Sequence, residues 1–215
     1  MEKQIYSNGQ YQIWQMSGKE HIHELADFVV KENYKHHAGD FDCEIIQDEV
    51  ESVYEEELDF ADDSAYFIAR HKSGSIIGTI RVFKWDRVKT LPLQRIFGIN
   101  PLKEIHPEKD YSYWHIGRFA IDSFSGVPTL TLFKLLMLSA INPIICDDKS
   151  YMIAEIDSKL LKVINALGLE TKQMGNSVNY LASETIPVCS SRKTLITFYR
   201  TNQNRRIFNT QKCIS

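Results

Sequence analysis

The stretch from residue 111 to residue 145, YSYWHIGRFAIDSFSGVPTLTLFKLLMLSAINPII, most limits what this chain can fold into. Its first part, 111–122, is dense in aromatic and β-branched residues and lacks proline, which predicts a strand. Residues 122–126 form a polar turn, and Pro128 suits the first position of a helix. Residues 129–140 are apolar on almost every side, which is typical of a buried helix, but they are too few to span a membrane. A helix that begins just after a strand offers free N–H groups to an anion such as phosphate.

Gly117 lies inside this predicted strand, between His115 and Arg118. A glycine inside a strand often marks a bulge or a close backbone approach. A bulge here would let His115 and Arg118, three positions apart and nominally on opposite faces, reach one cleft. The alternative is that Gly117 only relieves packing and that Arg118 makes a surface ion pair.

Composition points to one ordinary globular domain. The chain has 215 residues, 43% hydrophobic and 25% charged, and its net charge of −3 gives no general case for nucleic-acid binding. The four cysteines are scattered without a CxxC pair or metal-ligand spacing, and the N-terminus lacks the apolar core of a signal peptide. We therefore expect reduced thiols in a cytoplasmic protein. The four histidines between residues 21 and 37 lack an acidic or cysteine partner at ligand spacing, so no metal is expected.

Charge is unevenly spread along the chain. Residues 40–63 are strongly acidic and contain no lysine or arginine, whereas residues 81–108 hold six of these basic residues. Such runs usually form solvated faces, and the alternative is a basic surface for an acidic partner.

The rest of the chain alternates predicted strands and helices. Strands are expected at 11–15, 65–70, 75–85, 151–157, 178–182 and 186–188, helices at 19–35, 44–60 and 159–168, and a long loop at 86–110. This order predicts an α/β protein with a mixed sheet, antiparallel at the start and with parallel crossovers later. Residues 1–190 would form one domain, followed by a helix and tail at 191–215.

This order, and three motifs within residues 11–188, resemble the GCN5-related N-acetyltransferase (GNAT) superfamily. The chain is most similar to the long-chain branch, the acyl-homoserine-lactone autoinducer synthases and N-acyl amino acid synthases. Gly78-Thr-Ile-Arg81 resembles the branch's glycine-x-x-arginine strand, and residues 115–122 resemble its glutamate-x-x-arginine-phenylalanine-alanine-valine strand. Residues 153–182 resemble its closing half. The resemblance implies a GNAT-like mixed sheet of about seven strands with helices on both faces, splayed by a bulge in the central strand.

The chain departs from the family pattern at two places. His115 stands where the branch usually has glutamate, which leaves the catalytic assignment open. The turn at 122–127 has one glycine, whereas the acetyl-CoA loop is arginine/glutamine-x-x-glycine-x-glycine/alanine. Plain acetyl-CoA is therefore a less favoured donor.

The resemblance implies an N-acyltransferase, and the chemistry needs a base and groups that stabilise the oxyanion. His115 is the first candidate for the base and Glu155 the second, and we place Arg118 with them in the catalytic group. The alternative for His115 is a buried histidine bonded to a strand carbonyl. Arg81 and Arg118 could orient the carboxylate of an amino acid acceptor, or they could form ion pairs that lock Glu155 or Asp59 in place.

The acyl donor is expected to be a thioester of acyl carrier protein or CoA. Four residues at the end of the central strand and in the turn after it would contact its phosphate end: Ile121, Ser125, Gly126 and Val127. Trp114 and Phe119, with helix 129–140, could line an acyl tunnel or belong to the core. The basic stretch at 81–103 suits acyl carrier protein, which is acidic, as a partner. The competing functions are an acetyl-CoA-dependent acetyltransferase acting on a small amine and a decayed transferase that only binds an acyl ligand.

Overall fold

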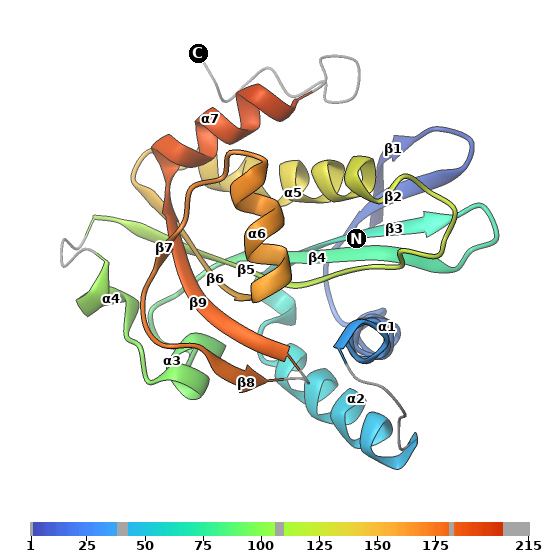
Figure 1. The fold of residues 1–215 in the computed structure, drawn as a ribbon, viewed down its shortest axis with the longest axis horizontal. Helices are drawn as coiled ribbons and strands as arrows, with labels where there is room; N and C mark the ends of the chain where they lie inside the picture. Colours follow the sequence, from blue (N-terminus) through green and yellow to red (C-terminus); the bar gives the residue numbers. More distant parts are fainter. Residues whose placement is uncertain (1, 38–42, 106–109, 181–182, 204–215) are drawn as a thin grey trace. The chain divides into compact units, whose positions relative to one another are not determined.

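The computed structural model describes residues 2–37, 43–105, 110–180 and 183–203. The chain divides into two compact units, one made of residues 1–83 and 118–137, the other of residues 84–117 and 138–215. The predicted central strand and the helix after it each have residues in both units. Figure 1 shows the ribbon of the chain, coloured along the sequence. The fold class is confirmed as mixed α/β: the described residues form nine strands, and the two beyond the expected seven are β1 and the two-residue β7.

The first unit is built on an antiparallel meander. Its strands are β1 (Glu2–Ser7), β2 (Tyr11–Met16), β3 (Ser64–His71) and β4 (Ile76–Lys84), each paired with the next. The β3–β4 hairpin turns at Gly74, whose φ of 93° lies in the left-handed region that glycine adopts without strain. Helices α1 (Ile22–His37) and α2 (Cys43–Leu58) and the short helix η1 (Ala61–Asp63) stand between β2 and β3.

Helix α1 covers the meander because its apolar residues recur at helical spacing. Leu25 and Val29 pack in one buried cluster with Met16, Tyr66, Ile68, Ile76 and Ala120. Gly78 of β4 is needed for a different contact. A Cβ built there would lie 3.0 Å from a side-chain carbon of Leu136, so the glycine lets the following long helix approach β4 closely.

The second unit holds the parallel pair of strands. The ten-residue strand β5 (Ser112–Ile121) runs parallel to β6 (Ser150–Asp157). Strand β6 in turn pairs antiparallel with β9 (Ser183–Ser191). The short strands β7 (Lys172–Gln173) and β8 (Val178–Tyr180) also pair with β9. The helices of this unit are α3 (Pro92–Phe97), α4 (Pro101–Glu104), α6 (Ser158–Ala166) and α7 (Arg192–Asn202).

The structure corrects three expectations. The segment 86–110 is not a plain loop, because Pro92 and Pro101 start short helices at positions where the missing proline N–H costs nothing. The helix predicted at 129–140 is α5 (Thr129–Ile145), which continues through Pro143 in its last turns. Cys43 and Cys189 are free thiols, whereas Cys146 is disulfide-bonded, so the expectation of reduced cysteines is wrong for that residue. No helix in the described ranges has the length and hydropathy needed to cross a bilayer.

The predicted kink of β5 is present, one residue later than expected. Arg118, not Gly117, has the left-handed backbone, with a φ of 52°. The pairing of β5 with β6 ends at Ile116 and Ala154, although both strands continue beyond these residues. The last residue of β5 that pairs with β6 therefore lies two positions before the left-handed residue.

Candidate active site

A buried network of charges in the first unit holds both of the predicted arginines. Arg81 of β4 contacts Oε1 of Glu57, and Arg118 of β5 donates from Nε to the same oxygen at 2.7 Å. Arg118 Nη2 lies 3.0 Å from Oε2 of Glu56. Tyr66 of β3 donates its hydroxyl to Oε2 of Glu57 at 3.1 Å. One carboxylate of α2 thus joins three strands.

The arginines decide the charge state of this carboxylate. Burial alone would raise the pKa of Glu57, but the guanidinium groups of Arg81 and Arg118 outweigh it and hold the pKa below its usual range. The guanidinium of Arg81 also lies 5.2 and 4.8 Å from the ring centres of Phe60 and Phe83, a favourable cation–π arrangement. Glu57 is therefore an ion at neutral pH although it is fully buried.

Sequence reasoning missed Glu57, because it lies in the acidic run that was expected to be a solvated face. One signal was available. Val50, Val53 and Glu57 follow the i, i+3, i+7 spacing of a buried helical stripe, and all three are buried. A carboxylate on such a stripe needs a buried cation as partner.

A second pair of site residues meets in the second unit. His115 and Glu155 were predicted on neighbouring strands, and β5 and β6 bring them together: His115 Nε2 lies 2.8 Å from Glu155 Oε2. His115 is 1% exposed, whereas the Glu155 side chain is 9% exposed. The ring is directed at a carboxylate rather than a strand carbonyl in this contact, so the two residues form an ion-paired or hydrogen-bonded dyad.

The turn between β5 and α5 is held by its own side chains. The main-chain N–H of Phe124 donates to Oδ1 of Asp122 at 2.9 Å, and the Ser125 hydroxyl donates to the Asp122 carbonyl at 2.8 Å. Gly126 has a φ of 75°, which explains the single glycine of the turn. The Val127 and Ile121 side chains are buried, so these two residues could offer a donor only their main chain.

One residue of this turn was not predicted to have a role. Phe124 is 84% exposed, and Leu130 in the first turn of α5 is exposed as well. Two apolar side chains therefore reach solvent beside the start of a long helix.

The two proposed tunnel residues have separate partners. Trp114 donates from Nε1 to Oδ2 of Asp147 at 3.1 Å, and Lys84 donates to the same oxygen at 2.9 Å. Phe119 packs edge-on against Phe133 of α5, with ring centres 5.3 Å apart. Trp114 belongs to the second unit and Phe119 to the first, and neither contact tests the tunnel.

The basic stretch 81–103 does not form one charged surface. Arg81 is buried, Lys84 pairs with Asp147, and Arg87 donates to the main-chain carbonyl of Tyr111. Arg95 and Lys103 are exposed. The charges available to an acidic partner are therefore fewer than the sequence suggested.

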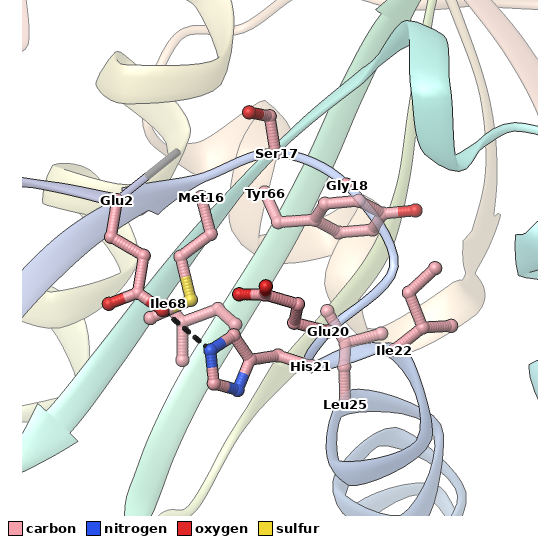
Figure 2. Close-up of a pocket in the computed structure, with 10 residues that line it drawn as sticks. All are labelled: Glu2, Met16, Ser17, Gly18, Glu20, His21, Ile22, Leu25, Tyr66 and Ile68. Atoms are coloured by element: carbon pink, nitrogen blue, oxygen red, sulfur yellow. Dashed lines mark hydrogen bonds and ion pairs between the residues drawn. The ribbon is translucent and has the colours of Figure 1, made fainter.

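One group in the described residues has ligand atoms close enough to hold a metal. Glu2, Glu20 and His21 meet beside a small hollow lined by Met16 and Tyr66 (Figure 2). His21 Nε2 already lies 2.6 Å from Oε1 of Glu2, and such exposed acidic groups are common without an ion. We therefore assign no metal role to this group.

Comparison with known proteins gives similarity of structure only. No protein-family model matches the chain, and no curated protein matches its sequence. The acyl-homoserine-lactone synthase LasI is similar in structure, with a TM-score of 0.59 and 16% identity over 91% of this chain and 96% of that one. FeeM, an N-acyl amino acid synthase from uncultured soil microbes, has a TM-score of 0.61 and 17% identity over 87% and 97%. The CoA-dependent acyl-homoserine lactone synthase BjaI, with SAM and isopentyl-CoA, has a TM-score of 0.56 and 14% identity over 90% of each chain. The chain therefore has the GNAT-like fold of these synthases, and the resemblance stated from the sequence is confirmed for the fold.

Proposed function

We propose that this protein is an N-acyltransferase that moves an acyl group from a thioester to the amine of a small molecule. The observation that carries the proposal is the end of β5–β6 pairing at Ile116 and Ala154, next to the left-handed Arg118. Main-chain N–H groups beside such a kink can stabilise the oxyanion of a thioester under attack. The His115–Glu155 dyad lies at the same part of the two strands.

The donor is a long-chain acyl thioester, carried by acyl carrier protein or CoA. One synthase of similar structure is CoA-dependent, so the fold is compatible with CoA as the carrier. The start of α5 supplies free N–H groups and a positive dipole end for the phosphate of the carrier, next to Ser125 and Gly126. The single glycine of the turn makes acetyl-CoA the less favoured donor. Because Arg81 is buried against Glu57 and the exposed Lys84 is paired with Asp147, a carrier protein would use the other exposed cations.

The His115–Glu155 dyad supplies the base for the reaction, and the two arginines orient the acceptor and hold a buried carboxylate in place. His115 and Glu155 together accept a proton from the amine, which must be neutral to attack the carbonyl carbon. Arg118, three residues further along β5, is held by Glu57 and Glu56, and we assign it to orient the acceptor. Arg81 is 1% exposed and already bonded to Glu57, so its part is to hold that carboxylate in place.

Three donors test this proposal with the purified full chain: a long-chain acyl carrier protein, the matching acyl-CoA and acetyl-CoA, each with a mixture of amino acids. Thiol release and mass spectrometry of the amide are the two measurements. We expect amide from the long-chain donors, and its loss in His115→Ala but not in the exposed control His23→Ala. Amide from acetyl-CoA alone would favour an ordinary acetyltransferase, and no amide from any donor would favour a protein that only binds an acyl ligand.

A further inference from the structure

The two oxygens of the Glu155 carboxylate have different surroundings. Oε2 lies 2.8 Å from His115 Nε2. Oε1 is buried and has no hydrogen-bond partner among the residues that the structure describes. A buried carboxylate oxygen without a donor is costly, and in native proteins it calls for a specific reason such as a ligand. Because its other oxygen is held in place, Oε1 has a fixed direction.

The same contact assigns the role of the histidine. A carboxylate that is to take a proton must be ionised and can then only accept hydrogen bonds, so His115 Nε2 is the donor in the reactive form of this pair. The Nε2–H of the histidine is therefore bonded to Glu155, and Nε2 has no lone pair with which to accept a proton from an amine. His115 is also the more deeply buried of the two, at 1% exposure against 9% for Glu155.

We propose that Glu155 Oε1 binds the ammonium group of the acceptor and takes its proton, and that His115 is a positioning residue that orients the carboxylate. This inference rests on the proposed acyl transfer and reverses the order of candidates that the sequence suggested. An ammonium group offers three donors and a positive charge, which match an oriented carboxylate oxygen with no partner.

The step balances without another reagent. The ammonium gives one proton to Oε1 and becomes a neutral amine. Its nitrogen forms a bond to the thioester carbonyl carbon, the carbon–sulfur bond breaks, and the thiolate leaves with the electron pair. The nitrogen then loses a second proton to the thiolate, which yields the amide and a free thiol. Glu155 returns its proton to solvent before the next turnover.

Glu155→Gln is the central variant, because it keeps the shape of the side chain and removes its charge. The twenty L-amino acids are tested singly with the long-chain donor, and the best acceptor is carried forward together with its 2-hydroxy analogue as a competitive inhibitor. We expect the acceptor KM to rise about 10- to 100-fold, the range of a lost charge-assisted hydrogen bond, with an unchanged donor KM. The preference for the ammonium compound over the hydroxy analogue should disappear.

Two further variants separate the roles. His115→Gln should lower kcat and keep the preference for the ammonium compound, because the charge of Glu155 remains. The control is Glu184→Gln, which makes the same change from carboxylate to carboxamide at an exposed residue of the neighbouring strand β9. It should behave as wild type. Thermal unfolding and donor KM show whether each variant is folded, and Glu155→Asp, which keeps the charge, replaces Glu155→Gln if that variant does not fold. For Glu155→Asp we expect a raised acceptor KM, with the preference for the ammonium compound retained.

The outcomes are distinguishable. An unchanged acceptor KM in Glu155→Gln, or loss of ammonium preference in His115→Gln alone, would overturn the assignment while leaving acyl transfer intact. Loss of that preference in a folded Glu155→Asp protein would also overturn it. If the wild-type protein makes no amide from any donor, the proposed function fails and this inference fails with it.

Discussion

Removing the Glu57 carboxylate should destabilise the protein more than any single surface change. In Glu57→Ala the guanidinium of Arg81 would remain buried without the carboxylate that contacts it, and Arg118 would lose one of the two carboxylates of α2 that it contacts. Breaking a buried ion pair by deleting one partner costs about 3–5 kcal/mol, because the other charge is left uncompensated. The hydrogen bond from Tyr66 is lost as well, which adds about 1 kcal/mol. A domain of this kind has about 5–15 kcal/mol in total, so the loss is a large fraction of its stability.

Urea unfolding followed by circular dichroism measures this loss as a change in the free energy of unfolding. The matched control is Glu55→Ala, which removes an exposed carboxylate two positions earlier on the same helix. Surface substitutions of this kind usually change stability by about 0.5 kcal/mol or less. If the two variants unfold at the same urea concentration, the buried network does not contribute as its geometry indicates.

Two further predictions concern stability. The folded-state pKa of Glu57 is lowered, so its contribution to the free energy of unfolding is fully present above the ordinary glutamate pKa of about 4.3 and is lost as the pH falls through the lowered value. Urea unfolding from pH 6 to pH 3 should therefore show a loss of unfolding free energy in wild type that Glu57→Gln lacks. Parallel curves of unfolding free energy against pH for the two proteins would refute this prediction. Asp157 accepts from the N–H groups of Lys159 and Leu160 at the start of α6, so Asp157→Ala should cost about 1 kcal/mol in thermal unfolding, whereas Asp157→Asn, also a good cap, should cost less.

Local chemistry explains which parts of the structure the sequence could predict. Strand β5, the hairpin at Gly74 and the start of α5 just after Pro128 could be predicted, because β-branched residues, turn residues and proline act on the chain within a few positions. His115 and Glu155 could be paired in advance, because a crossover helix between two strands makes them parallel neighbours. The ion pairs of Arg81 and Arg118 with Glu57 were not predicted, because they depend on how α2 packs on β4 and β5. That packing is a long-range contact, and no local pattern specifies it.

The kink of β5 connects the two buried pairs through one short stretch of chain. His115 is still in the part of β5 that pairs with β6, which places it beside Glu155. Three residues later Arg118 has a left-handed backbone, which costs roughly 1–3 kcal/mol for a non-glycine residue, and its side chain bonds to Glu56 and Glu57. The strain persists because two buried carboxylates hold the guanidinium. Glycine at position 118 would relieve the backbone but lose both contacts, so the network on α2 accounts for an arginine at a position where the backbone alone favours glycine.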